Sequence, residues 1–288
     1  MGACCAPSSG DRPRGAGDVA RGPARRDLVH VDAGAFLMGN EGSDAVPGDG
    51  EGPVRRVHVN AFSIAPTTVT NREFADFVRD TRYVTDAERG GLSFVFYLQL
   101  TEAQRRDTRR VVPGIPWWVE VADASWQRPE GPGSNVHARA GHPVVHISWH
   151  DAQAYCAWSG TRLPGEAEWE RAARGGLEGK RFAWGDELWR DGQPRCNVWR
   201  GMFPNAPAPA WTPGTIEAGA GEPNGFGLYN TCGNVWEWCA DWFTPGRRNL
   251  RGGSFLCHDS YCNRYRVAAR NSNTPSTTAS NIGFRVAA

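Results

Sequence analysis

The residues best suited to chemistry lie together near the C-terminal end of the chain. Residues 251–270 read RGGSFLCHDSYCNRYRVAAR and contain Cys257 and Cys262, a C-x4-C pair. Two cysteines five positions apart do not share a helical face, where neighbours are three or four apart, so the pair indicates a turn that brings the sulfurs together. Such a pair can form a disulfide, act as a reactive thiol with a resolving partner, or bind a metal.

The neighbours of the two cysteines are polar, aromatic and basic. Ser254 and Tyr261 supply hydroxyl groups. Positive charge that favours a thiolate comes from three arginines, Arg264, Arg266 and Arg270. Such a polar and aromatic setting is unusual for cysteines that serve only as small core hydrophobes. A structural disulfide and a pair of buried thiols remain the alternatives.

Composition limits the function classes. With 288 residues, 40% of them hydrophobic, the chain can bury one large core or two small ones. The 35 glycines, 20 prolines and 13 tryptophans predict a loop-rich domain with an aromatic core and limited regular structure. A net charge of +1 argues against nucleic-acid and anionic-membrane binding. The sequence contains no run of about 18 apolar residues, so it predicts no membrane-spanning helix.

The N-terminal segment differs in composition from the remainder. Residues 1–27 are rich in Gly, Pro, Ala and Arg and lack the apolar core of a secretory signal. We predict a disordered tail over 1–27, a single domain over 28–288, and the cytoplasm as the default compartment. The eight cysteines do not show the spacing of a small disulfide-stapled domain.

The sequence predicts only a few regular helices and strands around the cysteine stretch. Alternating apolar residues predict strands within 28–39 and 54–64. Thr70 with Glu73 and Ser148 with Asp151 predict two helix starts, and EAEWERAAR predicts a third helix. Residues 81–112 are ambiguous, with a strand-like SFVFYLQL and a charged TEAQRRDTRR that has helical propensity. Beyond residue 182 we expect loops and short strands.

These motifs together resemble the formylglycine-generating enzymes, also called sulfatase-modifying factors. The resemblance covers residues 28–288 and includes RLPGEAEWERAARGG, NGFGLYNTCGNVWEW and RGGSFLCHDSYCNRYRVAAR. It implies an α+β, C-type-lectin-like fold with little regular secondary structure. The C-H-D-S-Y-C segment is similar to the signature of the catalytic branch, whereas non-catalytic relatives lack those cysteines.

The resemblance also implies an activity. Family members oxidise the cysteine of a C-x-P-x-R motif in sulfatases to Cα-formylglycine, using O2, copper(I) and a thiol reductant. By resemblance, Cys257 and Cys262 are the copper ligands and redox-active thiols, with Ser254 and Tyr261 beside the reacting sulfur. The implied partners are the sulfatase polypeptide and the reductant, with no nucleic acid or membrane. Alternatively, Ser254 and Tyr261 only satisfy backbone groups in a turn.

Four further residues match positions around the substrate. Trp117 and Trp118 would wall the pocket, while Arg270 and Asn281 would position the substrate peptide. Ordinary core tryptophans and a structural ion pair of Arg270 are the competing interpretations.

Two calcium sites are implied by the same resemblance. The first uses oxygen ligands, which suit calcium, at Asn230, Gly233, Val235 and Glu237. On spacing alone, a plain loop with a buried Glu–Arg pair is the competing interpretation. The second begins at Asn197 and Val198, but its acidic ligand has no counterpart because the segment NAPAPAWTPGTIEAG contains no acid before Glu217.

Three positions bear on the compartment. Cys156 matches a position that animal members pair by a disulfide, and the partner position here is Val286. Val267 likewise stands where those members have a cysteine. These replacements suit a bacterial protein in the reducing cytoplasm. Two other functions stay open: a lectin-like binding module without turnover, and a metal-free thiol–disulfide oxidoreductase.

Overall fold

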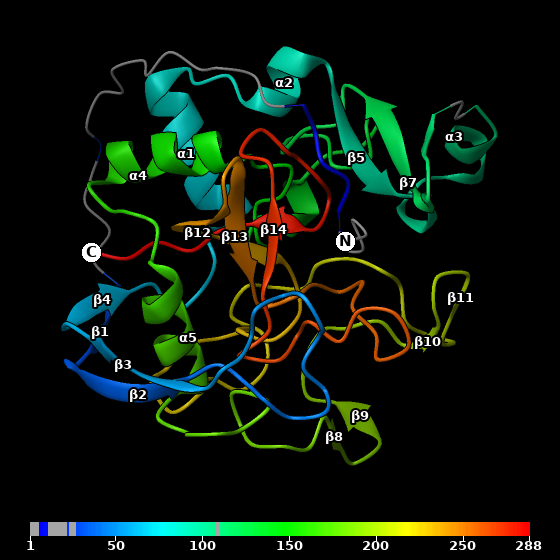
Figure 1. Ribbon diagram of the computed structural model, residues 1–288. Helices are drawn as coiled ribbons and strands as arrows, with labels where there is room; N and C mark the ends of the chain where they lie inside the picture. Colours follow the sequence, from blue (N-terminus) through cyan, green and yellow to red (C-terminus); the bar gives the residue numbers. More distant parts are fainter. Residues whose placement is uncertain (1–5, 11–21, 23–26, 108–109) are drawn as a thin grey trace.

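The computed structural model describes residues 6–10, 22, 27–107 and 110–288 and shows a mixed fold of short elements joined by long loops (Figure 1). Its helices are α1 (Asn71–Thr81), α2 (Asp86–Gly90), α3 (Glu102–Asp107), α4 (Trp149–Ser159) and α5 (Glu166–Arg174), with 3-10 turns at Tyr97–Gln99 and His137–Arg139. The α+β prediction is confirmed. Within the described ranges, no helix is both long and apolar enough to cross a membrane.

The predicted helix starts are confirmed, because the capping contacts are made. Thr70 and Glu73 form a reciprocal capping box at α1, and Ser148 and Asp151 form another at α4. At α5, the backbone N–H of Gly165 donates to Glu168 at 2.7 Å. The sequence did not predict α2, whose five residues are too few to show a helical period, although Thr85 and Glu88 cap it.

The largest sheet has four strands in the order β14-β13-β12-β15. These are β12 (Trp236–Thr244), β13 (Arg247–Arg251), β14 (Asn271–Asn273) and β15 (Ile282–Gly283). β12 and β13 form an antiparallel hairpin that places Glu237 opposite Arg251, while β15 runs parallel to β12. The nine-residue β12 is longer than the short strands expected from the sequence.

A second sheet of three strands lies beside α2 and α3 (Figure 1). Its members are β5 (Leu92–Phe96), β6 (Val111–Val112) and β7 (Ile115–Ala122) in the order β5-β7-β6. The remaining strands form pairs: β1 (Val29–Val31) with β4 (Phe62–Ile64), β2 (Gly34–Met38) with β3 (Arg55–Val59), β8 (Trp189–Arg190) with β9 (Gln193–Pro194), and β10 (Gly201–Met202) with β11 (Ala206–Pro207).

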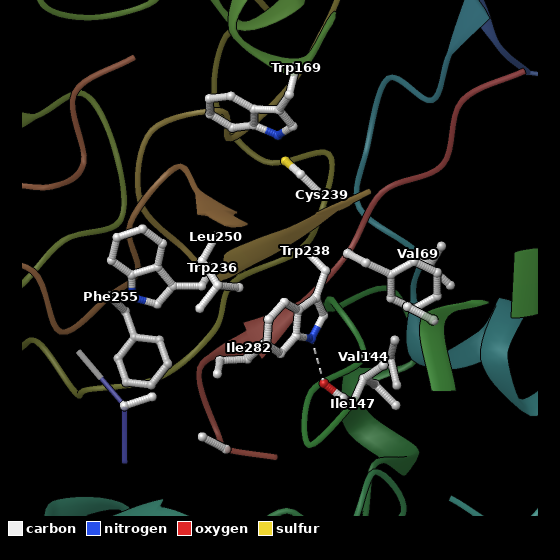
Figure 2. Close-up of a cluster of buried hydrophobic side chains, with 14 of the residues drawn as sticks. Val69, Val144, Ile147, Trp169, Trp236, Trp238, Cys239, Leu250, Phe255 and Ile282 are labelled. Carbon is white, nitrogen blue, oxygen red and sulfur yellow. Dashed lines mark hydrogen bonds between the residues drawn. The ribbon is translucent and has the colours of Figure 1, made fainter. Parts of the chain in front are cut away.

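The main core surrounds β12 and is aromatic, as the composition predicts. Trp236 and Trp238 are fully buried there, next to Leu250 and Ile282 (Figure 2). The indole nitrogen of Trp238 donates to the Ile147 carbonyl at 2.9 Å, which joins β12 to the loop before α4. Phe255, which follows the sheet, lies in the same cluster and connects this core to the cysteine stretch.

Part of the predicted disordered tail is packed against the domain. Residues 6–10 contact the loop after β14, and Ala6 is only 5% exposed. The disorder prediction therefore does not hold for this segment, because its backbone finds hydrogen-bond partners and Ala6 finds an apolar contact. The tail prediction for residues 1–5, 11–21 and 23–26 falls outside the described residues.

Candidate active site

The two cysteines of the C-x4-C pair meet in a turn directly after β13. Their Sγ atoms lie 3.3 Å apart, and both side chains are buried. The backbone N–H groups of Tyr261 and Cys262 both donate to the His258 carbonyl, at 3.0 and 2.7 Å, and this closes the turn. A disulfide requires about 2.05 Å between sulfurs, so the two thiols are adjacent but not bonded to each other.

Glycine at position 253 is required by the backbone around the pair. Gly253 has a φ of 73°, and a Cβ there would lie 2.7 Å from the Tyr265 Cα atom. Any other residue would therefore both strain the backbone and clash with it. The turn lets the Ser254 N–H point at the Cys257 sulfur, at 3.4 Å.

Aromatic side chains wall the thiol pair. Trp117 and Trp118 of β7, Phe203 and Tyr261 line one narrow pocket with the two cysteines. Tyr261 stacks on Phe203 at 4.5 Å between ring centroids and meets Trp117 edge-on at 5.0 Å. In the described part of the chain, the indole nitrogens of both tryptophans lack hydrogen-bond partners. The wall thus excludes water while leaving two donors unused.

Phe203 is a pocket residue that the sequence analysis missed. It lies in an irregular segment between β10 and β11, where no periodic pattern marks its role. The loop brings it to the site from more than 50 positions before the cysteines. A single aromatic residue in a loop gives no signal that could have identified it.

Ser254 and Asn281 are brought together from distant parts of the chain. The Asn281 amide donates to the Ser254 Oγ atom at 3.0 Å, and both residues are fully buried. Asn281 immediately precedes β15, so the parallel pairing of β15 with β12 places it at the site. This contact fixes the Ser254 hydroxyl within the cysteine turn.

The arginines that follow the cysteines have different partners. An Arg264 Nη1 atom lies 3.9 Å from the Cys262 sulfur. Arg264 also pairs with Asp49, whereas Arg266 makes a two-pronged pair with Glu51 at 2.6 and 2.8 Å. The loop before β3 therefore supplies the carboxylates that hold this basic stretch in place.

Arg270 forms a structural ion pair, one of the two roles left open by the sequence. Its guanidinium donates twice to the Glu166 carboxylate, at 2.5 and 2.9 Å, and also to the Gly50 carbonyl at 2.9 Å. Burial alone would raise the pKa of Glu166, but Arg251 and Arg270 outweigh it and hold that pKa below its usual value. A substrate contact by Arg270 stays a prediction.

Burial raises the thiol pKa of four other described cysteines. Burial raises the pKa of the Cys156 and Cys232 thiols to about 12. Burial also raises the pKa values of Cys196 and Cys239 well above the ordinary thiol value. Burial thus favours the protonated thiol at these four positions.

The comparisons with known proteins identify the family. Residues 16–288 match the family model described as "Sulfatase-modifying factor enzyme 1-like domain". The chain belongs to the sulfatase-modifying factor family. It is 50% identical to a formylglycine-generating enzyme of Streptomyces coelicolor, over 94% of this chain and 92% of that protein.

The sulfatase-modifying factor family also includes a relative named as inactive. The chain is 44% identical to the "Inactive C-alpha-formylglycine-generating enzyme 2" of Mus musculus, over 90% of this chain and 85% of that protein. Among solved structures, PvdO from Pseudomonas aeruginosa is similar with a TM-score of 0.63 at 23% identity, covering 96% of this chain and 99% of that one. That likeness supports the C-type-lectin-like fold.

The first calcium position expected in a sulfatase-modifying factor does not fit the ion through its carboxylate. Glu237 is fully buried, and Arg285 donates to both of its oxygens, at 2.6 and 2.7 Å. The Trp169 indole adds a third contact at 2.6 Å. Asn230 donates to the Ala218 and Ala220 carbonyls. The carboxylate charge is thus already neutralised by a guanidinium, and calcium here, with Gly233 and Val235, stays a prediction.

At the second calcium position of the family, the Asn197 side chain bonds to other protein groups. Asn197 is buried and donates to the Gly214 carbonyl and to Asn234. Val198 is also buried, and Glu217 lies instead beside His142. In the described ranges, no three His, Cys, Asp or Glu side chains gather into a metal cluster.

Proposed function

We propose that this sulfatase-modifying factor is a copper-dependent oxidase. It would convert the cysteine of a C-x-P-x-R motif in a sulfatase to Cα-formylglycine, with O2 as oxidant and a thiol as reductant. The observation that carries the proposal is the pair of buried thiols, Cys257 and Cys262, 3.3 Å apart beneath an aromatic wall. The formylglycine-generating enzymes at about half identity support the same reaction.

The two thiols fit copper(I). Adjacent soft sulfur ligands, with Arg264 close to Cys262, suit a monovalent soft metal and leave room in its coordination for a substrate sulfur. When bound, copper would supply the activation of O2 next to that sulfur. The oxidation of the cysteine side chain to an aldehyde releases two electrons and sulfide. Reduction of O2 to water takes four electrons, so the thiol reductant must provide the other two.

The remaining site residues bind, orient and exclude water. Trp117, Trp118 and Tyr261 keep bulk water from the sulfurs, which protects a reactive intermediate from side reactions. The Ser254 hydroxyl is held by Asn281 beside Cys257, where it can hydrogen-bond a substrate sulfur or an oxygen species. A C-x-P-x-R substrate would bind in extended form, because its proline disfavours a helix at the preceding residue.

The alternative function is peptide binding without turnover. The inactive relative at 44% identity shows that membership of the family does not by itself decide activity. The cysteine pair therefore has to be tested directly. A metal-free thiol–disulfide oxidoreductase would use the same two sulfurs but would consume no O2.

Mass spectrometry of a short C-x-P-x-R peptide tests the proposal. The peptide is incubated with the protein, Cu(I), O2 and dithiothreitol, alongside Cys257→Ser, Cys262→Ser and the matched control Cys156→Ala. We expect conversion to the aldehyde in the parent and the control, and loss in both site variants and without copper or O2. Conversion that persists in the site variants, or without either copper or O2, would refute this mechanism. A peptide that binds unchanged would indicate the binding module.

A further inference from the structure

The packed N-terminal segment, residues 6–10, is held mainly through its backbone. Asn273 at the end of β14 donates to the carbonyls of Ala6 and Pro7, at 3.4 and 3.0 Å, and accepts from the Ser8 hydroxyl at 2.6 Å. Ala6 and Pro7 are buried, while Ser8 is exposed. The segment thus enters the domain at its Ala6 end.

The loop after β14 continues the same pattern of contacts. The Ser9 N–H donates to Thr277 at 2.9 Å, and Thr274 donates to the Ser9 carbonyl at 2.7 Å. Ser276 donates to the Gly10 carbonyl at 2.8 Å. Side chains that bind successive main-chain groups recognise an extended peptide largely irrespective of its side chains. This loop therefore holds the segment through main-chain groups that any extended peptide would offer.

Residues 6–10 lie in a groove between the loop after β14 and the second sheet, and the second sheet forms the wall opposite the loop. Pro7 and Ser8 border a cavity that is lined by Phe94 of β5, by Glu120 and Ile115 of β7, and by the turn at 112–114. Figure 1 shows the N-terminal stretch, in blue, between β5 and the red segment around β14. The peptide is held by hydrogen bonds on one side and faces mostly apolar groups on the other.

Two chain segments connect this groove to the thiol pocket. Along β7, Ile115 lines the groove and Trp117, two residues and about 7 Å further on, lines the pocket. Along the last loop, Asn273 and Thr277 hold the segment, and Asn281 contacts Ser254. Ala6 belongs to the same apolar cluster as Phe255, which lies on the chain just before the cysteine turn.

The amino-acid sequence around the docked residues resembles the substrate motif. Position 5 is a cysteine, so residues 5–9 read Cys-Ala-Pro-Ser-Ser. This matches C-x-P-x-R at the cysteine and the proline, with Ser9 in place of the arginine. Cys5 itself lies outside the described residues, whereas residues 6–10 make the contacts given above.

We propose that residues 6–10 are an intramolecular competitor for the groove that takes the substrate polypeptide. The proposal rests on the function inferred above, because the competing ligand is a C-x-P-x-R peptide. A substrate would bind only when the segment leaves the groove. A segment docked in about nine molecules of ten leaves about one tenth of the protein competent, which weakens the apparent affinity about tenfold.

Fluorescence anisotropy tests the competition without requiring turnover. The first probe is a labelled C-x-P-x-R peptide in which serine replaces the cysteine. It is titrated into the full chain, a variant lacking residues 1–10, a variant with residues 6–10 replaced by Gly-Ser-Gly-Ser-Gly, and a control with residues 12–15 replaced by Gly-Ser-Gly-Ser. We expect about tenfold tighter binding to the first two variants and parental affinity in the control. Equal affinities in all four proteins would overturn the proposal.

A second probe separates this proposal from the activity itself. A labelled peptide of residues 5–10 is titrated into the variant lacking residues 1–10, and unlabelled C-x-P-x-R peptide is then added. We expect the tail peptide to bind and to be displaced. Absence of binding, or binding that excess C-x-P-x-R peptide leaves unchanged, would refute the competition. Peptide conversion by the same variant, measured by mass spectrometry, reports separately on the oxidase.

Discussion

Replacement of Glu237 by glutamine tests whether this carboxylate neutralises Arg285 or binds a cation. Both side chains are fully buried, and the guanidinium of Arg285 contacts both carboxylate oxygens. Glutamine keeps the shape of glutamate but removes its charge, which leaves the arginine buried without a counter-charge. Removing one partner of such a pair costs about 3–5 kcal/mol of unfolding free energy.

The expected shift in melting temperature follows from the size of the chain. An unfolding entropy of about 2.1 cal/mol/K per residue gives a total unfolding entropy of about 0.6 kcal/mol/K for a chain of this length. Each 0.6 kcal/mol of lost unfolding free energy therefore lowers the Tm by about 1 °C. Glu237→Gln should therefore lower the Tm by about 5–8 °C in differential scanning calorimetry. The matched control is Glu222→Gln, because Glu222 pairs with Arg190 and Arg195 but is 66% exposed. An exposed pair contributes less than about 1 kcal/mol, so the control should lose under about 2 °C.

Two outcomes would refute the ion-pair interpretation. One is a Tm for Glu237→Gln that matches that of Glu222→Gln. The other is a chelator effect: if EDTA lowers the Tm of the parent but not that of Glu237→Gln, the carboxylate holds a calcium ion. Because the Trp169 indole and Arg285 already engage this carboxylate, we expect EDTA to have no effect that depends on Glu237.

Two further predictions concern pH and the role of Arg270. Burial lowers the pKa of His146 from 6.5 to about 3, so below pH 6.5 the unfolded chain binds a proton that the folded chain does not. This contribution to stability is complete above pH 6.5 and is lost by about 1.4 kcal/mol per pH unit on acidification toward pH 3. His146→Gln should remove that slope in urea unfolding between pH 6.5 and 4.5, and an unchanged slope would contradict the assignment. Arg270→Lys loses the two-pronged contact with Glu166 and should lower the Tm by about 2–5 °C at an unchanged KM for the peptide. A raised KM at an unchanged Tm would instead support the substrate role.

Local signals in the sequence were sufficient for several elements. The capping residues at Thr70 and Ser148 predicted helix starts that the structure confirms, because a cap depends on residues only three positions apart. β12 was less predictable, since buried aromatic residues on both faces hide the alternation of a strand. α2 was missed because five residues are too few to show a period.

The site was only partly predictable, because the sequence shows local spacing but not which distant segments pack together. The spacing of Cys257 and Cys262 indicated a turn, and the structure brings their sulfurs to 3.3 Å. Phe203 could not be found, because its position depends on how a loop packs over the cysteine turn. The contact of Asn281 with Ser254 depends on the pairing of β15 with β12.

The sequence by itself determined the family, the α+β class, the helix starts and the cysteine pair, since these depend on residue types at short spacing. The tertiary structure decided which charges pair. Arg270 meets Glu166 and Arg285 meets Glu237 across 104 and 48 positions. It also decided that residues 6–10 are hydrogen-bonded to the domain. Such contacts form only when packing brings distant segments together and removes their polar groups from water, and no local pattern records that.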